Sequence, residues 1–341
     1  MCPGGSVSFV GTENGLEARA VPARGYEIDF VPSGQVLGKG AGGVWGMARM
    51  MRGIVTAFSV LSRRRPDLVI GVGGYASVPV SVAAVMRRIP LFLQEQNAVP
   101  GRANRVMGRM SRRVYTGFSG ASAYFPPGRA EVTGNPVRRE IAAAALSGAE
   151  PTPASPFVLF AMGGSQGARA INGLALAIGR RAKGEGRAMR ILLQTGPGEF
   201  DVVSKAVREE GLPIEPFPFT DRIGEMFARC HAVLMRAGAL SIAEAALFGK
   251  PCILIPYPHA ADRHQEKNAE EYCAGGAGVW IPQEEATPER ILSVLSSWAD
   301  DPSRPAAAAA GAARFSRPEA AVSILRSALR EIGREGEARG V

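Results

Sequence analysis

Glycine-rich turns that each follow a short apolar run are the feature that most restricts the fold of this chain. They are Gly-Val-Gly-Gly-Tyr-Ala-Ser at 71–77, Gly-Gly-Ser-Gln-Gly-Ala-Arg at 163–169 and Arg-Ala-Gly-Ala-Leu-Ser-Ile-Ala-Glu at 236–244. A helical pattern follows each turn. Strand, turn and helix in this order indicate parallel strands, because the helix carries the chain back to begin the next strand. The pattern therefore predicts an α/β fold.

Continuous apolar runs, rich in Leu and β-branched residues, predict strands that are covered on both faces. Ligands are expected at the carboxyl ends of these strands, in the cleft between two doubly wound domains. The predicted strands are 7–10, 68–72, 90–93, 113–116, 157–162, 190–194, 231–235 and 252–255.

The length of 341 residues is sufficient for two domains. Residues 147–156 are rich in Pro and small side chains, and they are the expected interdomain linker. The Ala-rich stretch 306–313 predicts a helix with a turn, and the tail 316–341 reads as one helical pattern with mixed charge.

The charge balance favours an anionic partner. Lys and Arg number 40 against 31 Asp and Glu, a formal charge of +9, which suits a nucleotide, a lipid diphosphate or an anionic membrane surface. The basic residues are scattered, and no basic run is interleaved with aromatic residues, so nucleic acid is not the predicted partner. No apolar run reaches transmembrane length, and the N-terminus lacks the pattern of a signal peptide.

The cysteines Cys2, Cys230, Cys252 and Cys273 show no CxxC spacing. They read as reduced thiols rather than as disulfide partners or zinc ligands. The histidines His259 and His264 have no third ligand at metal spacing, so no metal site is predicted.

The turn at 236–244 predicts a helix N-terminus, whose unpaired N–H groups and positive dipole end suit a phosphate. Glu244 follows Ser241 at the spacing of a capping box. The same carboxylate could instead accept hydrogen bonds from a ribose diol. The alternative is an ordinary capped surface helix, which Gly249 and Pro251 end.

None of the three glycine turns is a P-loop, and none matches GxGxxG with a ribose-binding acid at the usual spacing. Taken together, at corresponding places in two domains, they favour a diphosphate-bearing ligand. Polar loops at 94–101 and 258–268 follow buried strands and suit hydrogen bonding to sugar hydroxyls, although helix caps would use the same residue types.

The chain resembles the MurG family of bacterial transferases, which add N-acetylglucosamine to the lipid-linked muramyl-pentapeptide precursor of peptidoglycan. The resemblance runs from about residue 7 to the tail. The segments that carry it are 11–19, 71–75, Glu-Gln-Asn-Ala-Val-Pro-Gly (95–101), Gly-Asn-Pro-Val-Arg (134–138), 163–169, 236–244 and His264-Gln265.

The resemblance implies a GT-B glycosyltransferase with two doubly wound, Rossmann-like domains. It implies an acceptor and membrane-side domain at 1–137, a UDP-sugar domain at 138–316, and a last helix at 317–341 that packs on the first domain. The implied reaction joins N-acetylglucosamine from UDP-GlcNAc to the muramyl 4-hydroxyl of the undecaprenyl-diphosphate-linked pentapeptide, β-1,4 and with inversion. A base removes the hydroxyl proton while the departing UDP is stabilised electrostatically. No cofactor or metal is implied.

Roles for individual residues follow from the matching motifs. Ser165 and its neighbours would hold the nucleotide phosphates, Arg138 would lie near the nucleotide, and the backbone at Thr220 would read uracil. Glu244 would bind the ribose. The sugar hydroxyls would bind Asn97 and Gln265. The remaining donor contacts fall on Ala239, Leu240, Ser241, Ile242 and Ala243, and the acceptor diphosphate would meet Gly71, Gly73, Gly74 and Tyr75.

The sequence departs from the family pattern in two places. No Gly-Gly-Thr-Gly-Gly-His turn with its preceding strand is found, so the chain is expected to lack that opening segment and to expose a sheet edge. Gln94 stands where the family usually has His. The catalytic base is therefore unassigned, and Glu95 is the nearby candidate.

The segment 44–54 places arginines among apolar residues. In the family this region faces the membrane, so the resemblance implies a peripheral protein at the cytoplasmic face, with cell-wall synthesis proteins as further partners. Core packing of the same helix is the alternative. The expected membrane contacts are Trp45, Met47, Arg49, Met51 and Arg52.

Two other functions stay open from the sequence. One is a different UDP-sugar transferase or epimerase of the same fold, against which the acceptor-side segments 71–75 and 95–101 argue. The other is a UDP-binding but catalytically impaired scaffold of the cell-wall machinery.

Overall fold

The computed structural model describes residues 5–33, 41–74, 76–147, 155–164, 166–301 and 303–336, with the backbone alone for 41–45. The chain divides into two compact units. The first comprises Met1–Gln96, Pro100–Thr133 and Ala321–Val341, and the second comprises Asn97–Val99 and Gly134–Ala320. Every strand pair in the described residues is parallel, which confirms the predicted α/β fold.

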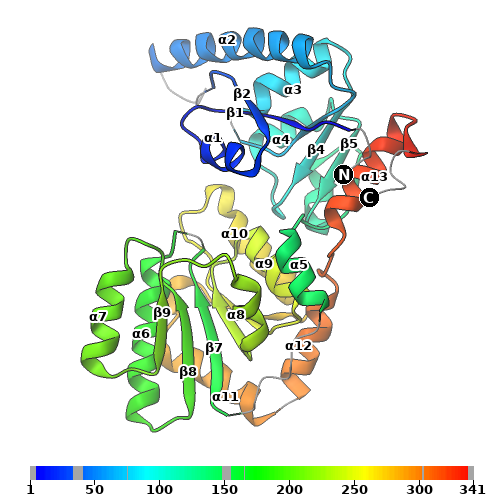
Figure 1. Ribbon diagram of the computed structural model, residues 1–341. Coiled ribbons are helices and arrows are strands. Elements are labelled where there is room, and N and C mark those ends of the chain that lie inside the picture. The colour runs from blue at the N-terminus through cyan, green and yellow to red at the C-terminus, as the bar shows by residue number, and fades with distance from the viewer. Residues whose placement is uncertain are drawn as a thin grey trace. The chain divides into compact units, whose positions relative to one another are not determined.

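The first unit contains a two-stranded and a four-stranded sheet (Figure 1). The smaller sheet pairs β1 (Ser8–Gly11) with β2 (Glu27–Phe30). The larger has the order β3 (Val69–Gly71), β4 (Leu91–Glu95), β5 (Arg113–Thr116) and β6 (Ala130–Val132). The helices are α1 (Glu17–Ala20), α2 (Ala41–Arg64), α3 (Ser77–Met86), α4 (Arg102–Met107) and α13 (Ala320–Glu331), with 3₁₀ turns at Pro22–Arg24 and Ser119–Tyr124.

Helix α13 comes last in the chain but packs in the first unit, beside β5 (Figure 1). Its Ile324 and Ala328 are buried against Phe92 and Tyr115. Helix α13 is shorter than the single helical pattern expected for residues 316–341. It ends at Glu331, and the chain turns away at Gly333, which has a left-handed φ of 75°.

The second unit is one six-stranded sheet in the order β12, β11, β10, β7, β8, β9. The strands are β7 (Phe157–Met162), β8 (Met189–Gln194), β9 (Ile214–Phe217), β10 (Ala232–Met235), β11 (Cys252–Leu254) and β12 (Gly278–Trp280). The α-helices are α5 (Arg139–Leu146), α6 (Arg169–Gly184), α7 (Phe200–Glu210), α8 (Ile223–Arg229), α9 (Ala239–Leu247), α10 (His264–Ala274), α11 (Pro288–Asp300) and α12 (Ser303–Ala313). Short 3₁₀ turns lie at Ala261–Arg263 and Gln283–Glu285.

The core of the second unit is built on its central strands. Leu159, Ile191 and Leu234, from β7, β8 and β10, are completely buried, and Ile178 of α6 packs in the same cluster. This burial on both faces explains why these strands read as continuous apolar runs.

Four strands were not predicted from the sequence. Each lies at an edge of its sheet or in the two-stranded sheet, where burial is partial. Their sequences carry charged or small residues between apolar ones, as in Glu-Ile-Asp-Phe of β2, so no continuous apolar run marks them. They are β2, β6, β9 and β12.

The prediction of a linker at 147–156 is wrong in position, because the second unit already begins at Gly134. Helix α5, which precedes that segment, packs in the second unit, and a Cβ on Gly224 would lie 3.0 Å from Cβ of Ala144. Residues 148–154 of the predicted linker lie outside the described part of the chain.

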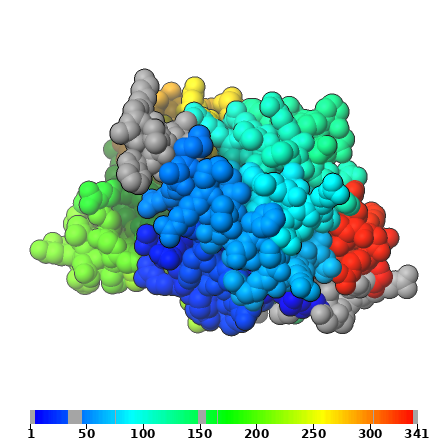
Figure 2. Space-filling view, turned by 90° about the horizontal axis from the view of Figure 1, so that it is seen from above, coloured from blue at the N-terminus to red at the C-terminus, as the bar shows by residue number. Residues whose placement is uncertain are grey.

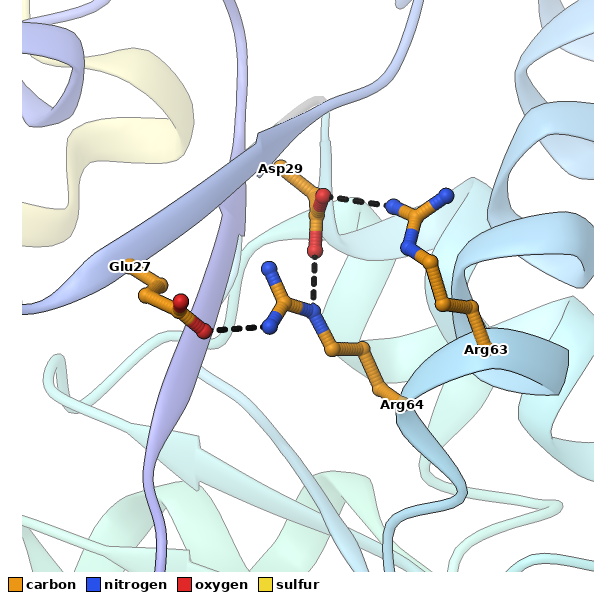
Figure 3. Close-up of polar contacts among 4 residues, drawn as sticks. All are labelled: Glu27, Asp29, Arg63 and Arg64. Atoms are coloured by element: carbon orange, nitrogen blue, oxygen red, sulfur yellow. Dashed lines mark hydrogen bonds and ion pairs between the residues drawn. The ribbon is translucent and has the colours of Figure 1, made fainter.

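A charged cluster joins β2 to the last turn of α2 (Figure 3). Arg63 Nη2 lies 2.7 Å from Asp29 Oδ1, and Arg64 Nε donates to Asp29 Oδ2 at 2.8 Å. Arg64 also pairs with Glu27. Burial would raise the pKa of Asp29, but the hydrogen bond and charge of Arg64, together with Arg63, outweigh it and lower that pKa. The cluster ties the two-stranded sheet to the long helix.

We expect Asp29→Asn to lower the free energy of unfolding at neutral pH by about 1 kcal/mol, since it removes the shared partner of two arginines. A carboxyl group whose pKa is lowered on folding stabilises the fold above its unfolded pKa, and the effect fades as the pH falls through the folded value. The difference between variant and parent in urea titrations should therefore shrink toward zero in acid. Asp67→Asn, at a pair with a 69% exposed carboxylate, is the control and should change little. Equal losses in the two variants would contradict this role of the cluster.

Candidate functional site

The topology of the second unit marks the place for a ligand. Strand β7 is central, and the chain adds β8 and β9 on one side of it before adding β10, β11 and β12 on the other. In sheets of this kind, a crevice opens at the carboxyl ends of the two strands where the direction reverses. Here these strands are β7 and β10, and they are followed by the turns at 163–168 and 236–238.

The turn after β7 depends on glycine. Gly167 has φ of +74°, and a Cβ there would lie 1.9 Å from the carbonyl oxygen of Thr195. Two buried amides hold this region: Gln194 Nε2 donates to the Gly164 carbonyl, and Asn172 Nδ2 donates to the Thr195 carbonyl, both at 3.0 Å. The backbone of the turn can therefore approach a ligand closely, while the hydrogen bonds from Gln194 and Asn172 fix its position. Ser165, predicted to bind phosphate, lies outside the described residues.

The turn after β10 leads into α9 without a side-chain cap. Gly238, in extended conformation, is the N-cap, so the cap position offers no side chain to the first-turn N–H groups. Such an N-terminus attracts an anion through its N–H groups and the helix dipole. Ala239, Leu240 and Ser241 form the first turn, and Leu240 is exposed. Ala239, Ile242 and Ala243 are buried.

The capping-box interpretation of Ser241 and Glu244 is wrong. The helix begins earlier than that spacing requires, because Gly238 takes the cap position, so Ser241 is already inside the helix. Glu244 instead lies in mid-helix, with its Oε1 3.4 Å from Arg138 Nη2.

Glu244 is a mostly buried acid beside a cation. Its side chain is 13% exposed. Burial raises its pKa, and the nearby charge of Arg138 only partly opposes this effect. Asn135, also buried, donates to the carbonyl of Ala239 at 3.4 Å. The structure thus brings Arg138, Glu244 and the start of α9 together within the second unit.

Arg236, to which the motif assigned no separate role, organises the next loop. Its guanidinium is buried and donates to the carbonyls of Ile255 and Pro256 and to Gln283 Oε1, at 3.2, 3.1 and 2.6 Å. It lies over the ring of Tyr257, and burial lowers its pKa. These contacts place a cation at the carboxyl end of β10. The sequence marked Arg236 only as the first residue of the motif 236–244 and did not predict its contacts.

Gln265 is oriented by the same loop, because its Oε1 accepts the N–H of Tyr257 at 2.9 Å. Asn97, which groups with the second unit, accepts a hydrogen bond from Asn268 through Oδ1 at 3.1 Å. Thr220 follows the edge strand β9, and its Oγ1 accepts the N–H of Arg222 at 3.0 Å. Asn97 and Thr220 lie in loops that follow β4 and β9. Gln265 is the second residue of α10, so the prediction of a polar loop at 258–268 is wrong from His264 onward.

The first unit gathers a second group of polar residues after β3 and β4. Gln96 Nε2 donates to the Val72 carbonyl at 3.1 Å, next to Gly73 and Gly74, which have φ of +89° and +79°. Gly71 is confined, since a Cβ there would lie 2.8 Å from Ser77 Oγ. Tyr75 lies outside the described residues.

Glu95 is buried at the end of β4, with 2% of its surface exposed. Its Oε2 accepts the N–H of Gly101 at 3.1 Å and Nδ2 of Asn104 at 2.9 Å. These contacts favour a role in holding its own loop, and the candidacy of Glu95 as a general base stays a prediction.

Helix α2 exposes apolar side chains. Met47, Met51 and Val55 are 54%, 55% and 67% exposed, with Arg49 and Arg52 exposed among them. Figure 2 shows the outer face of α2 uncovered. The side chain of Trp45 lies outside the described residues. The other face packs inward, through Ala57 and Leu61, so core packing accounts for one side of the helix only.

No helix in the described ranges combines the length and apolar character needed to cross a membrane. Nor do three His, Cys, Asp or Glu side chains come together there as a metal ion would require. Cys230 and Cys252 are buried free thiols, and Cys273 is partly buried, whereas Cys2 is outside the described residues. Burial raises the pKa of Cys230 to about 12, which makes the thiol unreactive.

Comparison with known proteins defines the class first. Residues 3–116 match the N-terminal domain of glycosyltransferase family 28, and residues 158–324 match the C-terminal domain of that family. A crystal structure of Acinetobacter baumannii MurG shares the fold, with a TM-score of 0.77 at 23% identity over 95% of this chain and 91% of that one. The calicheamicin glycosyltransferase CalG4 is also similar, with a TM-score of 0.66 at 16% identity over 97% and 92% of the two chains. The protein is thus a two-domain glycosyltransferase of GT-B type.

Sequence relatives then define the family. The UDP-N-acetylglucosamine–N-acetylmuramyl-(pentapeptide) pyrophosphoryl-undecaprenol N-acetylglucosamine transferase of Geobacter sulfurreducens is 38% identical over 94% of this chain and 88% of its own length. The protein of the same name from Syntrophotalea carbinolica gives the same identity and coverage. The chain belongs to this transferase family, which confirms the resemblance inferred from its motifs.

Proposed function

We propose that the protein transfers N-acetylglucosamine from UDP-GlcNAc to the muramyl 4-hydroxyl of undecaprenyl-diphosphate-linked muramyl-pentapeptide, in peptidoglycan synthesis. The observation that carries the proposal is 38% identity through 94% of the chain to transferases named for this reaction. The uncapped N-terminus of α9, beside the mostly buried Glu244, supports it from the structure.

The donor is assigned to the second unit. Glu244 accepts hydrogen bonds from the ribose diol, and the backbone at Thr220 reads uracil. The turn at 163–168, with Ser165, and the first turn of α9 hold the diphosphate. The same N–H groups stabilise the negative charge that develops on departing UDP, because they are already oriented toward it. Asn97 and Gln265 hydrogen-bond the sugar hydroxyls.

The acceptor is assigned to the first unit. The glycine turn 71–75 approaches its diphosphate closely, since glycines at positive φ leave the backbone uncovered. The exposed apolar and basic side chains of α2 contact an anionic membrane surface and place the protein peripherally at the cytoplasmic face. In this proposal residues 1–137 form the acceptor and membrane-side domain, residues 138–316 form the UDP-sugar domain, and residues 317–341 contain the last helix.

The proposal is tested by giving purified protein radiolabelled UDP-GlcNAc and the lipid-linked muramyl-pentapeptide. We expect label in the lipid-linked product and an equal amount of released UDP. Label that stays in UDP-sugar while UDP binds normally would contradict transferase activity and favour the scaffold interpretation.

UDP affinity is expected to fall in acid through the titration of Glu244. Its pKa is raised by burial, so the carboxylate takes up a proton above the ordinary value of 4.5. The ionised form accepts hydrogen bonds through two charged oxygens, whereas the protonated form is a weaker acceptor and carries a donor at one oxygen. Affinity should therefore be full above the pKa and decline below it. Calorimetry between about pH 4.5 and 8 should show this decline in the parent. In Glu244→Gln the decline should be smaller, because only the titration of UDP itself remains. An identical pH profile in both proteins would contradict the assignment.

Membrane binding is expected to depend on the exposed methionines of α2. Met47→Glu with Met51→Glu should reduce co-sedimentation with anionic vesicles by about tenfold or more, since both apolar burial and attraction to anionic lipid are weakened. UDP affinity should not change. Val202→Glu, which replaces a 69% exposed apolar side chain on α7, is the matched control and should bind vesicles as the parent does. Unchanged sedimentation of the α2 variant would favour the plain core-helix alternative.

A further inference from the structure

Asn268 of α10 is a completely buried polar residue. It is the last position of the predicted polar loop 258–268, and the family resemblance assigns it no role of its own. Its Oδ1 accepts the N–H of Ala98 at 2.8 Å. Its Nδ2 donates to Asn97 Oδ1 and to the carbonyl of Ala237, both at 3.1 Å. Both N–H donors of the amide are thus used, and one of its acceptor positions.

These three contacts reach two different parts of the second unit. Two of them fix the segment Asn97–Val99, and the third fixes Ala237, which directly precedes the N-cap of α9. A buried amide that satisfies all its donors is costly to rearrange, because any movement leaves polar atoms without partners. One side chain therefore holds the segment with Asn97 in register with the start of α9.

We propose that Asn268 is a positioning residue for the transferred sugar. Resting on the proposed function, in which Asn97 meets the sugar and the start of α9 meets the diphosphate, Asn268 fixes the separation between these two parts of the donor site. It also fixes the orientation of the Asn97 amide, because its own N–H can meet only the oxygen of that group. Asn268 does not contact substrate in this account.

Substitution of Asn268 is expected to reduce sugar transfer much more than it reduces the affinity for UDP. Asn268 positions one of the groups assigned to UDP, the start of α9, but not Glu244, Thr220 or the turn at 163–168. UDP affinity should therefore fall by less than about fivefold in Asn268→Ala and Asn268→Asp. The kcat/KM for UDP-GlcNAc should fall by about 10- to 100-fold, since small misplacements of a substrate-orienting group have effects of this size.

The two variants separate the donor and acceptor roles of Asn268. Asn268→Asp has nearly the same volume and keeps an acceptor for the N–H of Ala98, but it cannot donate to Asn97 or Ala237. Loss of transfer in Asn268→Asp as well as in Asn268→Ala would support positioning through the two donated bonds. UDP binding by each variant shows whether it is folded, so the comparison does not depend on Asn268→Ala alone.

Ile178→Val, a substitution in the core of the same unit, is the control for lost stability. Asn268 variants that lose UDP affinity and UDP-GlcNAc turnover in proportion, or that keep parental kinetics for UDP-GlcNAc, would overturn the inference. Failure of the proposed function is visible separately, in the parent protein. A parent that binds UDP-GlcNAc no differently from UDP and transfers no sugar would overturn that function, and the inference with it.

Discussion

Gly167→Ala is expected to produce the largest single loss in the second unit, about 2–4 kcal/mol of stability together with more than about tenfold weaker UDP binding. The residue has φ of +74°, which an L-residue rarely adopts, and its added Cβ would lie 1.9 Å from the Thr195 carbonyl oxygen. Neither atom can move alone, because the contact is with backbone. The turn after β7 must shift as a whole, and with it the groups assigned to the diphosphate.

The control for Gly167→Ala is Gly173→Ala, in α6, where an added Cβ meets nothing within 4 Å. Ala is favoured over Gly inside a helix by about 0.5–1 kcal/mol, so this variant should be as stable as the parent or more so. Thermal unfolding and UDP calorimetry on both variants measure the difference. Parental UDP affinity in Gly167→Ala would show that the turn does not bind the nucleotide.

Glu244→Ala is expected to weaken UDP binding by about 1–3 kcal/mol, roughly 5- to 150-fold, through loss of charged hydrogen bonds to the ribose. The carboxylate is mostly buried and lies 3.4 Å from Arg138.

Calorimetry with uridine and with UDP shows which part of the ligand Glu244 contacts. Both ligands contain the ribose, so the loss of a ribose contact must weaken the binding of both alike. Glu225→Ala, at an exposed ion pair with Arg222 on α8, is the control and should leave both affinities unchanged. An affinity for uridine equal to the parent's would exclude Glu244 from the ribose site.

The parallel α/β fold could be predicted because its central strands are buried on both faces. Residues 157–162 and 231–235 are continuous apolar runs for that reason, and the structure places β7 and β10 there. Strand β2 escaped the same test because Glu27 and Asp29 alternate with apolar residues and meet arginines of α2. Edge strands are recognised by their partners, which local sequence does not contain.

The helix N-terminus that follows β10 could be predicted for a related reason. A glycine turn and an acid within one helix are local features, so the residue pattern at 236–244 is sufficient to indicate a helix N-terminus. The N-cap of α9 could not be predicted from spacing, because both Gly238 and Ser241 are residue types that cap helices. The backbone conformation determines which of them is the cap, and it is extended at Gly238.

Buried amides were beyond the reach of the sequence. Asn268 bonds to Asn97, and the two are separated by 171 positions in the chain. Arg236 reads as part of a turn motif, yet its guanidinium serves a loop that starts at Ile255. Their roles arise from tertiary contacts, which neither periodicity nor motif spacing encodes.

The most direct test of the account follows the anomeric carbon of the sugar by NMR. UDP-GlcNAc labelled with ¹³C at C1 is incubated with the full chain and the lipid-linked muramyl-pentapeptide. The account predicts that the α-linked donor signal is replaced by a β-linked signal in the lipid fraction, with one UDP released per sugar transferred. A signal that moves instead to a free sugar, or to a UDP-sugar epimerised at C2, would contradict the account and identify a hydrolase or an epimerase.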